Sequence, residues 1–191
     1  MLVDRGAESY RLVVESLQAG KVVVMACDTI YGFVGRAPET ESMIRTIKGR
    51  GDDKPFLRLL SDPAELTHHG AAVPDPSILD LWPGPFTLIF SISGGGTAAF
   101  RVPEDRRLRQ IVREVGSALY STSVNRSGSP ALSEPTEIHR EFGSETALVE
   151  NAGELGDRVP STILDCRRLP GKILRQGAGI VPAHFAAQEG G

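Results

Sequence analysis

The sequence is poor in aromatic residues and has no excess of positive charge. Aromatic side chains make up 6% of its 191 residues, and 21 lysines and arginines face 24 aspartates and glutamates, so the formal net charge is −3. Proteins that coat nucleic acid are strongly basic, and binders of single strands need exposed aromatic platforms. Phe56, Phe86 and Phe90 fall in expected core strands, so the composition argues against general nucleic-acid binding.

Cysteines and long apolar runs are also scarce. The two cysteines, Cys27 and Cys166, lie far apart, and the four histidines show no ligand spacing. A disulfide framework and a Cys/His metal site are therefore not expected, and a reducing cytoplasm is the simplest location. The longest apolar run, residues 22–27, is far shorter than the ~18 residues that cross a bilayer, and no signal peptide is recognisable. We expect a cytoplasmic protein with no membrane segment.

Common catalytic signatures are missing as well. The sequence contains no G-x-x-x-x-G-K-[ST] or G-x-G-x-x-G nucleotide loop, no H-E-x-x-H zinc motif and no G-x-S-x-G nucleophile motif. Catalysis by histidine or by a covalent nucleophile is therefore not indicated.

Hydrophobic periodicity predicts helices that alternate with strands. Helices are expected over 7–19, 41–48, 105–115 and 136–142, and from about 63 and 76. Strands are expected over 21–26, 56–60, 87–92, 98–102 and 118–123, and near 147–150, 161–165 and 172–175. This order is typical of an α/β protein, and the short connections favour a mixed sheet.

The same pattern predicts the domain organisation. We expect one domain over residues 1–191, with a core at about 7–179 and a frayed tail at 180–191. Residues 28–32 follow the first buried strand, where α/β proteins place ligands, although an Asp-capped turn also fits them.

Positive charge is concentrated in two segments of the chain. Residues 45–58 and 101–113 each carry five cations and two acids, for a local net charge of +3. Lys48 and Arg50 lie at the end of an expected helix, where cations complement the helix dipole. The same cations could bind phosphate, because arginine offers a planar fork and lysine a point charge. Composition leaves both interpretations open.

Small polar residues lie on one face of two expected strands. By the strand period of two, Ser121, Ser123 and Asn125 share a face, as do Thr97 and Arg101. Buried polar groups need partners, which here are either a neighbouring loop or a ligand.

Short segments connect these features in one order. They are DTIYG at 28–32, KGR at 48–50, KP at 54–55, LWPGPFT at 81–87, RVP at 101–103, STSVN at 121–125, STI at 161–163 and LRQG at 174–177. Over about residues 7–179 the series resembles the YrdC-type threonylcarbamoyl-AMP synthase family in its short, single-domain form. The resemblance implies a twisted mixed sheet flanked by helices, with a concave basic ligand cleft.

The resemblance also implies an activity. Members of this family condense L-threonine, bicarbonate or CO2, and ATP to threonylcarbamoyl-AMP, and release pyrophosphate. A separate tRNA threonylcarbamoyltransferase then modifies tRNA, so that transferase is an implied partner, with a weak RNA contact as a further one. ATP is the implied nucleotide substrate, Mg²⁺ is expected with it, and no membrane partner is implied. The chemistry needs positioning and charge stabilisation rather than a covalent nucleophile.

By position, the resemblance assigns roles to individual residues. The implied catalytic pair is Lys48 and Arg50. The implied ATP-binding residues are Lys48, Arg50, Lys54, Thr97, Ser123, Asn125 and Arg175. The implied threonine-binding residues are Thr29, Arg101, Ser121 and Ser161. No protein ligand to a metal is implied.

Two departures from the family pattern keep other functions open. Ala26 and Cys27 stand where the family commonly has Pro-Thr, and Leu59 stands where many members have histidine. Both sites are expected near the amino-acid pocket, so a same-fold paralogue with a different acyl substrate is one alternative. An RNA-binding module without catalysis is another, and threonine-dependent pyrophosphate release would distinguish it. Whether Cys27 is buried or exposed is not decided by the sequence.

Overall fold

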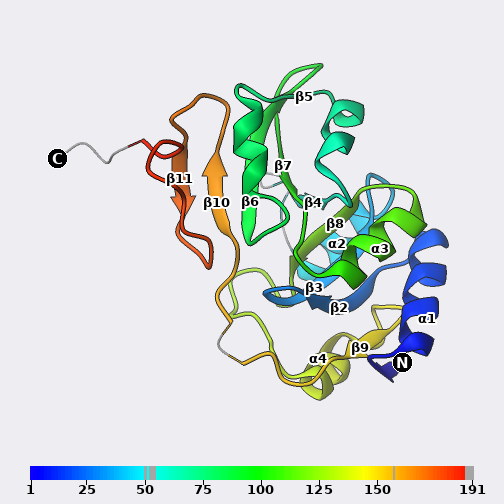
Figure 1. The fold of residues 1–191 in the computed structure, drawn as a ribbon. Coiled ribbons are helices and arrows are strands. Elements are labelled where there is room, and N and C mark those ends of the chain that lie inside the picture. Colours follow the sequence, from blue (N-terminus) through cyan, green and yellow to red (C-terminus); the bar gives the residue numbers. More distant parts are fainter. Residues whose placement is uncertain (50, 52–54, 157, 188–191) are drawn as a thin grey trace.

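One mixed β-sheet organises the structure, and helices cover parts of both its faces (Figure 1). The computed structural model describes residues 1–49, 51, 55–156 and 158–187. Within these residues the strands are β1 (Leu2–Asp4), β2 (Val23–Cys27), β3 (Ile30–Arg36), β4 (Leu57–Leu59), β5 (Ala71–Ala72), β6 (Phe86–Ile92), β7 (Thr97–Arg101), β8 (Leu119–Ser123), β9 (Val149–Asn151), β10 (Thr162–Asp165) and β11 (Lys172–Arg175). The helices are α1 (Ala7–Gln18), α2 (Glu41–Lys48), η1 (Pro63–His69), η2 (Pro76–Leu81), α3 (Arg106–Val115) and α4 (Pro135–Phe142). The predicted α/β class is confirmed.

Strands that are distant in the sequence become neighbours in this sheet. Their order is β1-β9-β2-β3-β8-β4-β7-β6-β10-β11, with β5 paired to β6. The pairs β2–β3 and β3–β8 are antiparallel, whereas β4–β7 and β6–β10 are parallel, so the predicted mixed sheet is also confirmed. β9 and β10 follow each other along the chain but lie near opposite ends of the order.

The expected helices begin and end at residues suited to capping. The Asp105 side chain accepts a hydrogen bond from the Leu108 backbone at the start of α3, and Gly116 ends that helix with a φ of 76°. The two helices expected from about 63 and 76 are the 3-10 helices η1 and η2, each preceded by a capping aspartate and opened by a proline. No helix in the described part of the chain is both long and apolar enough to cross a membrane.

β3 lies at the centre of the sheet although its sequence does not predict a strand. Gly32 and Gly35 interrupt its apolar run, and glycine lowers strand propensity. The fold requires the small residue, since a Cβ on Gly35 would lie 2.3 Å from Thr40 Oγ1. The turn expected over 28–32 is correspondingly shorter, because β3 begins inside that segment.

Residues 180–191, expected as a frayed tail, are packed in their first part. Phe185 is 6% exposed and joins a hydrophobic core cluster. Its carbonyl accepts a hydrogen bond from the Gly171 amide at 2.7 Å, and the Gly171 carbonyl accepts one from the Ala187 amide at 2.7 Å. The expectation is therefore wrong as far as Ala187, because burial of one aromatic side chain orders the backbone around it.

Helices cover the two faces of the sheet unequally. α1 and α3 lie side by side on one face and pack on Met25, Val34 and Leu119 (Figure 1). α2 and α4 cover the opposite face through residues such as Ile44 and Phe142. The face under α1 and α3 continues onto β6, β7 and β10, where no described helix covers it.

Candidate functional site

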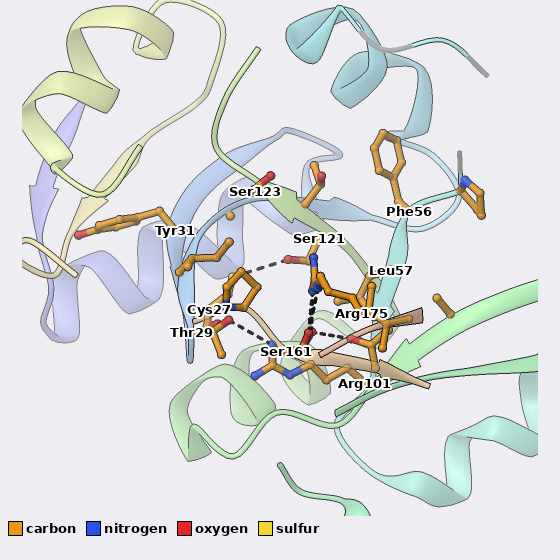
Figure 2. Close-up of a pocket in the computed structure, with 18 of the residues that line it drawn as sticks. Cys27, Thr29, Tyr31, Phe56, Leu57, Arg101, Ser121, Ser123, Ser161 and Arg175 are labelled. Atoms are coloured by element: carbon orange, nitrogen blue, oxygen red, sulfur yellow. Dashed lines mark hydrogen bonds between the residues drawn. The ribbon is translucent and has the colours of Figure 1, made fainter. Parts of the chain in front are cut away.

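A pocket of about 350 Å³ lies on this uncovered part of the sheet. It is lined by strands from both halves of the sheet order, from β3 and β8 to β10 and β11. Its lining includes six residues that the sequence proposes for ligand binding: Thr29, Arg101, Ser121, Ser123, Ser161 and Arg175 (Figure 2). The fold thus brings candidates for both ligands to one cavity.

Strand alternation decides which side chains reach the pocket. Thr87 and Ile89 of β6 line it, whereas Leu88 between them is buried in the core on the other side of the sheet. Arg101 of β7 likewise lines the pocket, whereas Phe100 lies in that core. One face of these strands therefore packs in the core, and the opposite face lines the pocket.

Arg101 is held against the pocket wall by an ion pair. Its Nη2 donates to Asp28 Oδ2 at 2.9 Å, and its Nη1 lies 3.5 Å from Thr29 Oγ1. The residue is 4% exposed, and its Nε is buried without a hydrogen-bond partner among the described residues. Since a guanidinium has five N–H donors, these partners leave donors available for an anion.

Arg175 approaches the same region from β11. Its Nε and Nη2 donate to the Ser161 carbonyl at 3.2 and 2.7 Å, and Ser161 Oγ lies 2.8 Å from Thr87 Oγ1. Burial, and secondly the nearby Arg101 cation, lower the pKa of Arg175 from its usual value. Figure 2 shows the two arginines on either side of Ser161. An anion between them would relieve their repulsion.

The chemistry of the lining favours anionic ligands. The described lining residues include these two arginines and neither aspartate nor glutamate. Arginine forms charge-assisted, often bidentate hydrogen bonds with carboxylates and phosphates, and hydroxyls add further donors and acceptors. Among the described residues, no group of three His, Cys, Asp or Glu side chains is placed to hold a metal ion.

Cys27 and Ser121 form the wall of the pocket next to β3. Ser121 Oγ donates to Cys27 Sγ at 3.8 Å, and a Cβ on Gly32 would lie 3.0 Å from both atoms. Burial raises the pKa of the Cys27 thiol to about 12, so the thiol is neutral at physiological pH. Cys27 is therefore a buried residue that borders the cavity, which answers the question left open by the sequence.

Leu59 does not line the pocket, contrary to expectation. It is fully buried and packs with Leu108 and Leu119 under α3. β4 contributes Leu57 to the pocket instead. The leucine that departs from the family pattern at position 59 is thus a core residue and not a residue of the pocket lining.

Lys48 and Asn125 lie together beside the pocket but outside its lining. Lys48 is 3% exposed, and its Nζ donates to the Ser123 carbonyl at 2.7 Å, to the Asn125 carbonyl at 3.1 Å and to Asn125 Oδ1 at 2.8 Å. Ser123 Oγ donates to the same Oδ1 at 2.6 Å. Because an ammonium group has three donors, these acceptors engage all of them. Ser123, which also lines the pocket, links this network to the cavity.

Of the three remaining candidates, the structure describes one. Thr97 is exposed at the beginning of β7. Arg50 and Lys54 lie outside the described residues, so their roles remain predictions from the sequence.

Asp28 and Thr87 belong to the site although no ligand role is predicted for either from the sequence. Asp28 pairs with Arg101, and Thr87 contacts Ser161. An aspartate after a strand is typical of a capped turn, and a threonine is a common residue inside a strand, so neither residue type by itself indicates a ligand. The available signals are that Asp28 begins the DTIYG segment at 28–32 and that Thr87 ends the LWPGPFT segment at 81–87.

Sequence comparison relates the chain to a known family. The protein-family model Sua5_yciO_yrdC, described as "Telomere recombination", matches residues 15–177. A Bos taurus protein named threonylcarbamoyl-AMP synthase is 29% identical over 210 residues, covering 98% of this chain and 75% of its own length. A Bacillus subtilis protein of the same name is 27% identical over 186 residues, covering 90% of this chain and 54% of its own length. The chain thus spans about half the length of the Bacillus relative.

Structural comparison finds the same fold. P. abyssi Sua5 complexed with L-threonine has a TM-score of 0.78 at 24% identity, with 93% of this chain and 57% of the Sua5 chain covered. E. coli YciO has a TM-score of 0.80 at 24% identity, with 96% of this chain and 98% of the YciO chain covered. Both likenesses concern the fold.

Proposed function

The chain belongs to the Sua5/YciO/YrdC family, and we propose that it is a threonylcarbamoyl-AMP synthase. The observation that carries the proposal is a single pocket that combines Arg101 and Arg175 with the hydroxyls of Thr29, Ser121 and Ser161. The names of the curated relatives support the same function. The substrates are L-threonine, bicarbonate or CO2, and ATP, and the products are threonylcarbamoyl-AMP and pyrophosphate.

On the threonine side, Arg101 binds the carboxylate of the amino acid. Its donors that lack a protein acceptor suit a carboxylate oxygen, and Thr29, Ser121 and Ser161 offer partners for the threonine hydroxyl. The complex of P. abyssi Sua5 with L-threonine supports this choice of amino acid. Because no described lining residue is acidic, the pocket holds no carboxylate that would retain the substrate amine as ammonium. The neutral amine can then capture CO2 as a carbamate.

On the nucleotide side, the proposed contacts remain those implied by the sequence. Arg175 and Ser123 line the pocket directly, and Lys48 with Asn125 shapes the loop that follows Ser123. Thr97, Arg50 and Lys54 complete the proposed set, with Lys48 and Arg50 as the catalytic pair. Mg²⁺ would arrive with ATP and take its ligands mainly from phosphates and water, since the described residues offer no cluster of three ligands.

The proposed reaction requires two anions to be held together. A carbamate oxygen attacks the α-phosphorus of ATP, the bond from that phosphorus to the bridging oxygen breaks, and pyrophosphate leaves. Arg101 and Arg175 offset the repulsion between the anions, and the burial of Arg101 strengthens its effect. Holding the reactants in line supplies the remainder of the catalysis.

Cellular context is part of the same proposal. The product passes to a tRNA threonylcarbamoyltransferase in the cytoplasm, with at most a weak RNA contact by this chain. Phe56, Phe86 and Phe90 are buried, so they do not offer exposed rings on which bases could stack, and this argues against the RNA-binding alternative. The thiol of Cys27 in the pocket wall favours one other candidate, a same-fold enzyme with a different acyl substrate.

An adenylate-formation assay tests the proposal. Purified protein is incubated with ATP, Mg²⁺, bicarbonate and L-threonine, with each component omitted in turn, and the products are measured by mass spectrometry and pyrophosphate release. We expect threonylcarbamoyl-AMP in the complete mixture alone. Serine should react roughly 10- to 200-fold less well, because it lacks one methyl group. Equal turnover with serine or glycine would favour the changed-substrate candidate, and no threonine-dependent pyrophosphate would refute the proposal.

A further inference from the structure

Asp28 occupies an unusual position at the end of β2. Its φ is 54°, and it is the one non-glycine residue with a positive φ in the described part of the chain. Aspartate and asparagine adopt this left-handed conformation more readily than other side-chain-bearing residues. The backbone therefore turns sharply here, and the side chain points toward the segment after β7.

The carboxylate of Asp28 binds three groups, one at the end of β7 and two in the segment that follows it. Oδ2 accepts hydrogen bonds from Arg101 Nη2 at 2.9 Å and from the Glu104 amide at 2.8 Å. Oδ1 accepts one from the Asp105 amide at 2.9 Å. One carboxylate thus fixes both the guanidinium of Arg101 and the backbone that leads into α3.

Arg101 depends on this contact for its orientation. Its other side-chain hydrogen bond, to Thr29, is 3.5 Å long, and its Nε has no partner among the described residues. A long arginine side chain loses considerable rotamer freedom when it is fixed, so a single 3.5 Å contact is a weak restraint. The Asp28 ion pair, with both side chains at most 10% exposed, is the strong restraint.

We propose that Asp28 is a positioning residue that holds the Arg101 guanidinium at the pocket wall in the orientation that a substrate carboxylate requires. This inference rests on the proposed function, in which the carboxylate is that of threonine. It assigns Asp28 no contact with substrate. Its effect passes through Arg101.

Two possible roles of Asp28 predict opposite results. If the carboxylate merely neutralised Arg101, its removal would leave a more positive pocket and tighter anion binding. If the carboxylate positions Arg101, its removal leaves the guanidinium mobile. Threonine must then order the guanidinium when it binds, which weakens threonine affinity. The sign of the change in threonine affinity therefore separates the two roles.

Two variants remove the carboxylate while keeping the backbone turn. Asn and Gly both tolerate a φ of 54°, so Asp28→Asn and Asp28→Gly should fold, which circular dichroism checks. Asp165→Asn is the matched control, because Asp165 pairs with Arg167 at 2.6 Å away from the pocket lining. By calorimetric titration, both Asp28 variants should bind threonine roughly tenfold or more weakly and ATP within about twofold of the parent. Unchanged or tighter threonine binding would overturn the inference.

A double variant tests whether the effect passes through Arg101. In an Arg101→Lys background the planar fork is absent, so adding Asp28→Asn should change threonine affinity by less than about twofold. A full additional loss in the double variant would show that Asp28 acts by another route and would overturn the inference.

A readout without threonine separates this inference from the proposed function. The Nε–H of Arg101 is buried, so its hydrogen exchange, followed by NMR, should be slow in the parent and roughly tenfold faster in Asp28→Asn. Equal exchange rates would mean that Asp28 does not hold Arg101. A parent protein that binds no threonine would refute the proposed function, while the exchange rates would still decide whether Asp28 positions Arg101.

Discussion

The ammonium nitrogen of Lys48 lies 2.8 Å from the Oδ1 of Asn125, which joins the end of α2 to the loop after β8. Two backbone carbonyls, those of Ser123 and Asn125, also accept hydrogen bonds from this nitrogen. A lysine that is 3% exposed would be strongly unfavourable without such acceptors. The pair therefore holds the Ser123 edge of the pocket in place.

Lys48→Met should destabilise the protein, because it leaves partly buried acceptors of the 123–125 segment without their donor. We expect the free energy of unfolding to fall by about 2–4 kcal/mol, measured by urea denaturation. Lys21→Met, at an exposed position, is the control and should change it by less than about 0.5 kcal/mol. Equal stabilities of the two variants would show that the Lys48 hydrogen bonds contribute little.

Arg101→Lys and Asn125→Ala should affect different substrates. Lysine cannot reproduce the planar fork of Arg101, so threonine affinity should fall by roughly tenfold or more while ATP affinity stays within about twofold. Asn125→Ala disturbs the loop next to Ser123 and should do the reverse. Calorimetric titration of each variant with each substrate measures this, with Arg167→Lys as a control outside the pocket lining. The opposite pattern would mean that the two halves of the site are exchanged.

Gly35→Ala should destabilise the centre of the sheet. The new Cβ would lie 2.3 Å from Thr40 Oγ1 and 2.8 Å from Thr40 Cβ, and Thr40 is itself fully buried. Overpacking of this kind typically costs about 1–3 kcal/mol, which thermal unfolding should detect as a lower Tm. Gly6→Ala, where a Cβ meets no atom within 4 Å, is the matched control. A variant at position 35 as stable as that control would contradict the packing argument.

The thiols of Cys27 and Cys166 should resist alkylation in the native protein. Burial raises the pKa of each to about 12, so at pH 8 the thiolate fraction is roughly a thousandfold smaller than for an ordinary cysteine. Labelling by a thiol reagent should be slow in buffer, prompt in concentrated urea, and about tenfold faster for each unit of pH gained below pH 12. Prompt labelling of one equivalent in buffer would place a thiol in contact with solvent.

Much of the fold follows from local patterns in the sequence. The helix that holds Leu108 and Val112 inward, with Asp105 and Gly116 at its ends, is visible as periodicity and capping residues. These are properties of neighbouring residues, so they need no knowledge of the rest of the chain. Local patterns do not predict β3, because its glycines are required by close contacts with neighbouring residues and are unfavourable for strand propensity.

In the candidate site, too, some residues follow from local patterns in the sequence and others do not. Strand periodicity predicts that Ser121 and Ser123 share a face, and both line the pocket. Asn125 follows the end of β8, so the period of two no longer places it, and its amide turns to Lys48. Leu59 packs in the core under α3. That core and the pocket lie on the same face of the sheet, so strand periodicity cannot tell which of the two a residue on this face will join.

By itself the sequence determined the residue types, the faces of most strands and the ends of most helices, since these depend on spacing and on local hydrogen bonds. Only the tertiary structure decided that Arg101 and Arg175 meet in one pocket and that Asp28 holds the first of them. The physical reason is the strand order, which seats β10 parallel to β6 and β8 between β3 and β4. Such pairings join residues far apart along the chain, and they are selected by the packing of the whole sheet rather than by any local signal.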